Sequence, residues 1–210
     1  MVRILIADDH PVVREGLKKM FEKVSDISIA GEACNGQEVL NKIERNDYDL
    51  VLLDISMPGR DGLDILRELR SKRPRLPVLI LSIHREEQYA IRALKAGAAG
   101  YLTKKSISDE LIKAVREVLC GRKYITSTLA EKLASYINDD TEKPIHELLS
   151  DREYLVMRMI VKGKTRKEIA EELFLSVNTI STYRARILEK MKMKNSAELI
   201  QYAMEKHLTD

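Results

Sequence analysis

Polar side chains that could do chemistry follow several short apolar runs in the first half of the chain. They are Asp8, Asp9, Asp54, Ser82 and Lys104. If these runs are parallel strands of one open sheet, the polar residues meet at its carboxyl edge, where such sheets bind ligands. Three carboxylates that converge repel one another and require a cation. Oxygen donors favour a hard ion that keeps part of its water, so the sequence predicts a Mg²⁺ site.

The elements that must position these residues alternate between apolar runs and segments of helical period. Two runs are continuously apolar, as in strands that are buried on both faces of a parallel sheet. The predicted strands are 4–7, 27–30, 50–53, 78–81 and 100–102. The predicted helices are 11–23, 37–45, 63–71, 87–96 and 109–119, and Gly97 and Gly121 suit helix ends. This pattern predicts a doubly wound α/β domain with a five-stranded parallel sheet.

The second half of the chain has no strand pattern. Helices are predicted at 126–137, 151–161, 166–173, 177–191 and 196–206. The polar, proline-containing stretch 138–144 is the best linker in the sequence. We therefore predict the α/β domain over 1–121, a linker with one helix over 122–145 and a small all-α four-helix domain over 146–210.

Composition excludes several classes of protein. Hydrophobic residues make up 44% of the chain and charged residues 33%, which is typical of a folded chain rather than a disordered one. No stretch free of charged residues exceeds 11 residues, whereas a membrane span needs about 20 apolar residues. Acidic residues stand where a signal peptide would be apolar, so we expect a cytoplasmic protein with no membrane partner.

The net charge of +3 is unevenly distributed. Residues 138–153 hold six acids and two bases, whereas residues 162–194 hold nine bases and four acids. Such a basic segment suits an anionic partner, although a solvated helix face has the same pattern.

Some polar residues, taken singly, could have a structural role instead of a chemical one. An acid after a strand can cap the next helix, and we expect Asp8 or Asp9 to serve partly in this way. Cys34 and Cys120 form no metal or disulfide pattern, so we expect both to be small core residues. His84 is expected in an exposed loop at the rim of the site.

The polar residues of the first domain match a known pattern. Asp8-Asp9, DISMPGRDG at 54–62, Ser82 and AGAAGYLTK at 96–104 stand in order at family-like spacing. With these motifs, residues 1–121 resemble the receiver domain of bacterial response regulators. The resemblance implies strand order 2-1-3-4-5 and a phosphoryl group accepted on Asp54 from a sensor histidine kinase.

The same resemblance implies how Mg²⁺ is held. Asp9, Asp54 and the backbone carbonyl of Ser56 would bind the ion, and Asp8 would act through water. Position 56 is also where aspartyl-phosphate phosphatases carry a second acid. Its replacement by serine argues against a dedicated hydrolytic enzyme.

Two further residues have roles that phosphoryl transfer requires, because this chemistry depends on positioning and charge neutralisation, and a third, Tyr101, is either a simple core residue or a switch by resemblance. Lys104 would supply charge and Ser82 a hydrogen bond. Tyr101 matches the aromatic residue that turns inward in receivers when the hydroxyl at position 82 moves toward the phosphate.

Two C-terminal helices, 166–173 and 177–191, have the spacing of a helix-turn-helix, although an unspecified α-hairpin has it too. LSDRE at 149–153, GKTRKEIA at 163–170 and LSVNTIST at 175–182 resemble the LuxR-type DNA-binding domain. With the receiver in front, the chain resembles a NarL/FixJ-family transcriptional response regulator.

This second resemblance implies contacts with DNA by position. Residues expected at phosphates are Thr165, Arg166 and Lys167. Residues expected at base edges are Ser181, Thr182 and Ala185, with Asn178, Arg186 and Lys190 at the flanks. The family often has Lys-x-His where this chain has Ser181-Thr-Tyr183, so the base preference does not transfer. The buried face is expected to carry Val177, Ile180, Ile187, Leu188 and Met191. Arg184 lies toward that face, and we expect it to pair with an acid of a preceding helix such as Glu153, rather than to contact DNA.

The predicted function is a switch rather than an enzyme. When phosphorylated, the chain would form a homodimer, bind double-stranded promoter DNA and regulate transcription, with RNA polymerase as a further partner. The alternative is a receiver-type phosphotransfer enzyme with an unrelated helical tail.

Overall fold

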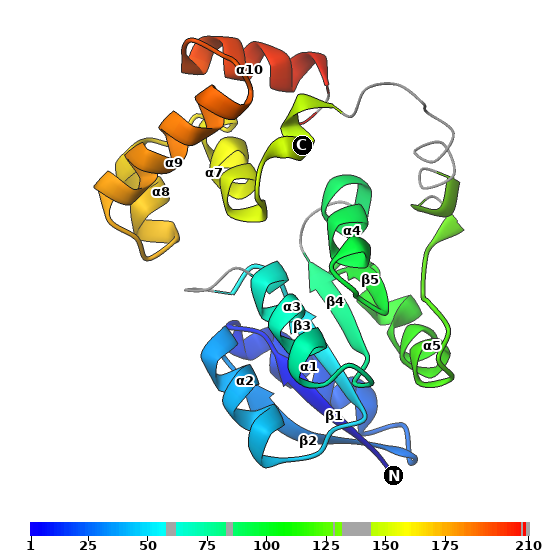
Figure 1. Cartoon of the computed structure of the whole chain (residues 1–210). Coiled ribbons are helices and arrows are strands. Elements are labelled where there is room, and N and C mark those ends of the chain that lie inside the picture. Colours follow the sequence, from blue (N-terminus) through cyan, green and yellow to red (C-terminus); the bar gives the residue numbers. More distant parts are fainter. Residues whose placement is uncertain (58–61, 83–85, 128, 132–143, 207, 209–210) are drawn as a thin grey trace. The chain divides into compact units, whose positions relative to one another are not determined.

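A five-stranded parallel sheet organises the first half of the protein (Figure 1). The computed structural model describes residues 1–57, 62–82, 86–127, 129–131, 144–206 and 208. The strand order is β2-β1-β3-β4-β5, as predicted. The strands are β1 (Val2–Ala7), β2 (Ile27–Ala33), β3 (Leu50–Asp54), β4 (Val78–Ser82) and β5 (Gly100–Thr103).

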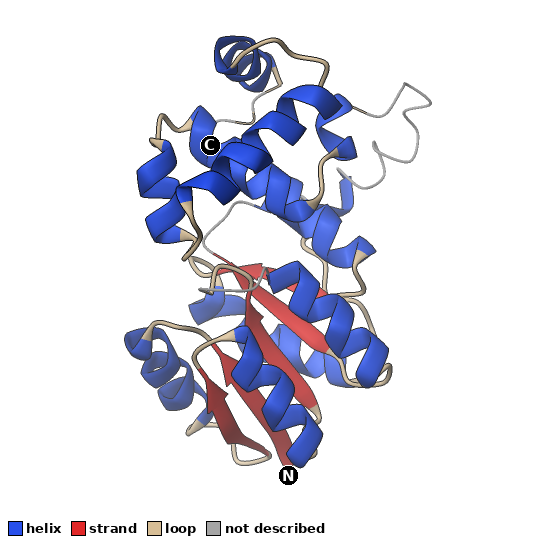
Figure 2. Ribbon diagram, turned by 60° about the vertical axis from the view of Figure 1, so that its left-hand side comes forward, coloured by secondary structure: helices blue, strands red, loops and turns tan. Residues whose placement is uncertain are grey.

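Helices cover both faces of this sheet, and Figure 2 shows the red strands between layers of blue helices. The helices are α1 (Pro11–Phe21), α2 (Gly36–Arg45), α3 (Gly62–Lys72), α4 (Glu86–Lys95) and α5 (Ile107–Leu119). Every residue of β3 and β4 is buried, because both strands lie inside the sheet and under helices on both sides.

The period-2 alternation of each strand divides the core between the two faces. One face packs against α1 and α5, with Leu17 and Leu111 contributing from the helices. The strand residues of that cluster are Ile4, Ile6, Ile27, Leu50, Leu52, Leu79, Leu81 and Leu102. Their neighbours in the strands, such as Val51 and Ile80, are equally buried and point to the other face.

Most elements begin and end within two residues of their predicted bounds. Gly97 and Gly121 follow helices with φ of 101° and 78°, the left-handed conformation that glycine adopts without strain. The cysteine prediction is wrong. Cys34 and Cys120 are exposed, because Cys34 lies between β2 and α2 and Cys120 follows the end of α5.

The second half of the protein is helical. The chain separates into two compact units, Met1–Asp139 and Asp140–Asp210. The second unit contains a 3-10 turn, η1 (Ile145–Leu148), followed by α7 (Asp151–Val161), α8 (Arg166–Glu172), α9 (Val177–Lys190) and α10 (Ser196–Glu205). The helix predicted at 126–137 and the linker at 138–144 fall largely outside the described residues. None of the described helices combines the length and apolar content needed to cross a bilayer.

Side-chain caps start the helices of this unit. Ser150 and Thr165 each form a capping box with a glutamate three residues later, Glu153 and Glu168. Ser176 caps α9 by accepting a hydrogen bond from the backbone N–H of Thr179 at 3.0 Å. The caps therefore place the turn between α8 and α9 at Leu173–Ser176, close to its predicted position.

The predicted buried face of α9 is correct except at its first residue. Ile180, Ile187, Leu188 and Met191 are buried, whereas Val177 is 43% exposed because it occupies the first turn of α9. In α10, Leu199 and Ala203 pack inward while Met204 stays exposed.

Substitutions of two glycines test the packing of the sheet edge. A Cβ atom on Gly100 would lie 2.8 Å from the Tyr124 carbonyl oxygen and 2.9 Å from Leu79 Cδ1. Gly100→Ala should therefore lower the free energy of unfolding by about 1–3 kcal/mol in urea titrations. Gly16 lies in α1, and a Cβ atom there would meet no other atom within 4 Å. Gly16→Ala should therefore raise the free energy of unfolding by about 0.5–1 kcal/mol. Equal effects of both substitutions would contradict this account of Gly100.

Candidate functional site

Strand register brings the first acidic residues together. Ala7, the last residue of β1, pairs with Leu53 of β3, so Asp8 follows on one strand where Asp54 ends the other. Asp8 and Asp54 are completely buried, and Asp9 is about one-third exposed at its side chain. The convergence of these carboxylates at the carboxyl edge of the sheet is as predicted.

Lys104 compensates the two buried carboxylates. Its Nζ lies 2.6 Å from Asp8 Oδ2 and 2.7 Å from Asp54 Oδ2. The backbone N–H of Lys104 donates to the Ser82 carbonyl at 2.6 Å, which fixes the chain after β5 against the end of β4. One ammonium therefore bridges the carboxylates that follow β1 and end β3.

Burial and charge shift the ionisation of these groups in identifiable ways. Burial raises the pKa of Asp54 above its ordinary value, although Lys104 and the Ser56 N–H oppose the rise. Burial alone would lower the pKa of Lys104, but Asp54 and Asp8 outweigh it and raise that pKa. The ionised form of Asp54 is thus held in a site that disfavours it, which is a reason for the site to bind positive charge.

The donor set fits a small hard cation. Donor atoms of Asp8, Asp9, Asp54 and His10 all lie within 4.8 Å of one another. Asp8 Oδ2 and Asp9 Oδ1 are buried oxygens that accept no well-formed hydrogen bond from the described residues. Their near neighbours are nitrogens that can carry positive charge, Lys104 Nζ and His10 Nδ1. Carboxylate oxygens in this arrangement are suitable ligands for Mg²⁺.

His10 was missed in the sequence analysis. Its Nδ1 lies 2.8 Å from Asp9 Oδ1 and 3.2 Å from Asp8 Oδ1, and its position directly after the two acids could have indicated this. His10 is also the N-cap residue of α1, so the expectation that Asp8 or Asp9 occupies that position is wrong. Asp8 Oδ1 instead accepts a hydrogen bond from the His10 N–H at 2.9 Å.

The remaining predicted residues of this site surround Asp54. The Ser56 N–H donates to Asp54 Oδ1 at 2.8 Å, and Ser56 itself is exposed. Ser82, the last residue of β4, is completely buried, and so is Tyr101 in β5. His84 and the loop residues 58–61 lie outside the described residues.

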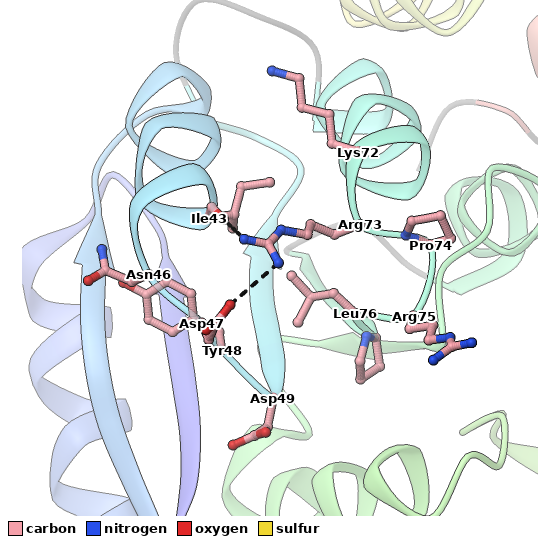
Figure 3. A pocket seen from close by; sticks show the side chains of 11 residues that line it. Ile43, Asn46, Asp47, Tyr48, Asp49, Lys72, Arg73, Pro74, Arg75 and Leu76 are labelled. Carbon is pink, nitrogen blue, oxygen red and sulfur yellow. Dashed lines mark hydrogen bonds and ion pairs between the residues drawn. The ribbon is translucent and has the colours of Figure 1, made fainter.

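A hollow of about 490 Å³ lies at the opposite end of the strands from the acidic residues (Figure 3). It is lined by residues before β3 and β4, among them Tyr48, Arg73 and Leu76. The Arg73 guanidinium donates to the Ile43 carbonyl at 2.9 Å and approaches Asp47 at 3.4 Å, which joins α3 to α2. This hollow contains none of the residues predicted to do chemistry.

The phosphate-contact residues predicted in the second unit lie at the start of α8. The Thr165 hydroxyl donates to Glu168 Oε2 at 2.7 Å within the capping box. Arg166 Nη1 donates to Ser181 Oγ at 3.4 Å, which links α8 to α9. Lys167 is exposed and has no partner among the described residues.

The residues predicted at base edges lie along the outer side of α9. Thr182, Ala185, Asn178 and Arg186 are exposed, and Ser181 is half-buried. Thr182 and four neighbouring residues surround a hollow of about 350 Å³, which we name the α9 hollow. It is lined by Asn178, Thr179, Thr182, Tyr183 and Arg186. Tyr183 was not predicted, although its helical spacing from Thr179 and Arg186 puts it on their face.

Lys190, which is predicted at the DNA flank, forms an ion pair within the unit and is exposed. Its Nζ lies 2.6 Å from Oε2 of Glu153, whose side chain is almost fully buried. Burial alone would raise the pKa of Glu153, but Lys190 and the Ser150 donors lower it overall. The predicted Arg184–Glu153 pair is therefore wrong, because Lys190 holds that carboxylate. Arg184 Nε instead donates to Ser196 Oγ at 2.9 Å, which links α9 to the start of α10.

Comparison with known proteins covers both units. The response regulator receiver domain family matches residues 4–116, and the bacterial regulatory proteins of the luxR family match residues 147–203. The chain is 36% identical to the response regulator UvrY of Escherichia coli (strain K12) over 206 residues, covering 97% of this chain and 94% of that protein. The chain belongs to the NarL/FixJ family of response regulators.

Other members of the family have similar length and fold. The response regulator GacA of Pseudomonas aeruginosa is 33% identical over 212 residues, covering 100% of this chain and 99% of GacA. RcsB from Salmonella enterica serovar Typhimurium, solved bound to promoter rprA with the phosphomimetic BeF3⁻, superposes with a TM-score of 0.67. It is 26% identical and covers 96% of this chain and 97% of RcsB. This response regulator is thus a signalling protein with a LuxR-type DNA-binding domain, not a classical enzyme.

The raised pKa of Asp54 predicts an effect on the stability of this response regulator. A carboxyl whose pKa is raised on folding costs stability once pH exceeds its ordinary pKa. In EDTA at pH 7, Asp54→Asn should therefore increase the free energy of unfolding, measured in urea. The gain should shrink as pH falls toward the ordinary range of aspartate, because the proton then removes the same charge.

Asp64→Asn is the matched control for this measurement. Asp64 is exposed and pairs with Arg67 on the surface, so the change should stay within about 0.5 kcal/mol at every pH. If Asp54→Asn destabilised the protein at pH 7, burial would not be the dominant influence on Asp54.

Proposed function

We propose that this chain is a phosphorylation-dependent transcription regulator whose switch is Asp54. The observation that carries the proposal is the fully buried Asp54 carboxylate at the end of β3, 2.7 Å from the Lys104 ammonium and beside two more acids. A sensor histidine kinase would donate the phosphoryl group, and the protein would act in the cytoplasm, where that kinase domain and promoter DNA are accessible.

The nucleophile is an oxygen of the Asp54 carboxylate. It attacks phosphorus while the bond from phosphorus to the donor histidine nitrogen breaks, and the imidazole keeps the bonding electrons. The Ser56 N–H and the Lys104 ammonium, which contact Asp54 at 2.8 and 2.7 Å, hold it in position. Lys104 then neutralises charge on the transferred oxygens, and Ser82 donates a hydrogen bond to one of them.

The same site would hold Mg²⁺ through Asp9, Asp54 and the Ser56 carbonyl, with Asp8 acting through water. When bound, the ion supplies positive charge opposite the phosphoryl oxygens. The close spacing of the carboxylates supports this assignment, as do the buried Asp8 Oδ2 and Asp9 Oδ1, which accept no well-formed hydrogen bond from the described residues. Slow loss of the phosphoryl group by the chain's own hydrolysis would reset the switch.

The signal would leave the site through the buried residues Ser82 and Tyr101. A new phosphoryl group attracts the Ser82 hydroxyl, and Tyr101 occupies the space that this movement opens. Phosphorylation would promote a homodimer, and the exposed apolar side chain of Met204 on α10 supports a contact between two copies. Two copies would read paired half-sites, since one helix-turn-helix covers few base pairs.

The DNA-binding surface would consist of α8 and α9. Thr165, Arg166 and Lys167 would contact phosphates, and the outer residues of α9 would face base edges in the major groove. These residues are Asn178, Ser181, Thr182, Ala185 and Arg186. The ion pair of Lys190 with Glu153 favours a positioning role for Lys190. The domain bounds 1–121, 122–145 and 146–210 complete the proposal, and RNA polymerase would be a partner at the promoter.

Labelling with acetyl phosphate tests the switch directly. With Mg²⁺ present, the chain should gain one phosphoryl group by intact-protein mass spectrometry, and Asp54→Asn should gain none. Asp64→Asn should be labelled like the parent chain, because Asp64 is exposed on α3 and pairs there with Arg67. Undiminished labelling of Asp54→Asn would contradict the assignment of Asp54.

The salt dependence of binding tests the roles proposed on α8. Lys167→Ala should weaken binding to all DNA sequences alike and reduce the slope of log K against log salt by about one unit. Lys113 lies exposed on α5 of the receiver, so Lys113→Ala should leave the slope unchanged. A change of preferred sequence in Lys167→Ala, measured by selection from random duplexes, would show that Lys167 contacts bases instead.

A further inference from the structure

The α9 hollow is formed by one helix alone. It is lined by Asn178, Thr179, Thr182, Tyr183 and Arg186. These residues follow one another at spacings of one or three positions and share the outer face of α9. Ile180 and Ile187 on the opposite face are completely buried in the core of the unit. Core packing of the inner face therefore fixes the orientation of α9, so the residues of the hollow stay on the outside of the unit.

Several hydroxyl groups near the hollow are already engaged within the protein. Thr182 Oγ1 donates to the Asn178 carbonyl at 3.1 Å, and Ser181 Oγ donates to the Val177 carbonyl at 3.0 Å. Thr179 Oγ1 shares a hydrogen bond of 2.8 Å with Ser176. Ser181 and Thr182 consequently offer no free hydroxyl hydrogen to a ligand, whereas the methyl groups of the threonines remain available.

Three side chains around the hollow have no such engagement. Within the described part of the chain, Asn178, Tyr183 and Arg186 make no side-chain hydrogen bond or ion pair. Tyr183 is half-buried, so its ring forms a wall of the hollow, whereas Tyr154 in the core is completely buried. The hollow thus combines threonine methyl groups, an aromatic wall and polar groups at its edge.

We propose that Tyr183 is a specificity-determining residue and that the α9 hollow takes the C5 methyl group of a thymine. This inference rests on the proposed binding of DNA by α9. The thymine methyl is the one apolar group on the major-groove edges of unmodified base pairs, and threonine methyls with an aromatic ring are suited to it. The guanidinium of Arg186 and the amide of Asn178 then remain available for purine acceptors next to that thymine.

Replacement of thymine by deoxyuridine tests this proposal, because it removes only the methyl group. A preferred duplex is selected from random DNA with the full chain, phosphorylated by acetyl phosphate. Each thymine is then replaced singly and the affinity is measured at one salt concentration. In the parent protein, one replacement per half-site should weaken binding about three- to fivefold, as expected for one buried methyl group.

Variants of the chain assign this effect to a residue. Tyr183→Ala should bind the thymine and deoxyuridine duplexes equally, whereas Tyr183→Phe keeps the ring and should retain the discrimination. Glu189→Ala is the control on the same helix, since Glu189 is exposed and does not line the α9 hollow, and it should discriminate like the parent. Far-ultraviolet circular dichroism checks that each variant is folded.

Two results would overturn the proposal. Tyr183→Ala could retain the full discrimination, or no thymine in the selected duplex could be sensitive to loss of its methyl group. Failure of the proposed function is a separate outcome, because the parent chain would then show no preference for the selected duplex over a scrambled one.

Discussion

The convergence of three carboxylates at the carboxyl edge of a parallel sheet is the constraint on which the receiver unit depends. Parallel register brings Asp8 and Asp54 to the same edge, and core packing buries both. Like charges in such a place are costly, and Lys104 offsets part of that cost at 2.6–2.7 Å. The negative charge that Lys104 leaves uncompensated is the physical basis of the proposed binding of a cation at this site.

In the helical unit, internal pairing of polar groups leaves the outer face of α9 accessible. Polar groups that are needed for folding are paired internally through the capping boxes of Ser150 and Thr165 and the Glu153–Lys190 contact. Hydroxyls on α9 donate back to their own helix. On the outer face of α9, Asn178, Tyr183 and Arg186 keep side chains without a hydrogen bond or ion pair among the described residues. The proposed specificity of this unit therefore depends on which side chains the fold leaves unpaired.

Much of this protein was predictable from its sequence. The alternation of apolar runs with helical segments predicts the sheet and its covering helices, because burial on both faces permits only apolar strand residues. The site could be predicted as well, since polar residues directly after successive parallel strands must meet at one edge. The capping signals around Ser150, Thr165 and Ser176 are local in sequence, so the helix starts of the second unit were also within reach.

Tertiary structure alone decided the pairing of individual side chains. The helical period of α9 does not show whether Arg184 or Lys190 pairs with Glu153. In the packed unit, Lys190 forms the ion pair with Glu153, and Arg184 donates a hydrogen bond to Ser196 instead. His10 joins the acids, and both cysteines are exposed, because the path of the chain between elements sets these positions. Periodicity specifies which face of an element is buried. Partners across elements depend on distances and angles that a pattern along one chain does not contain.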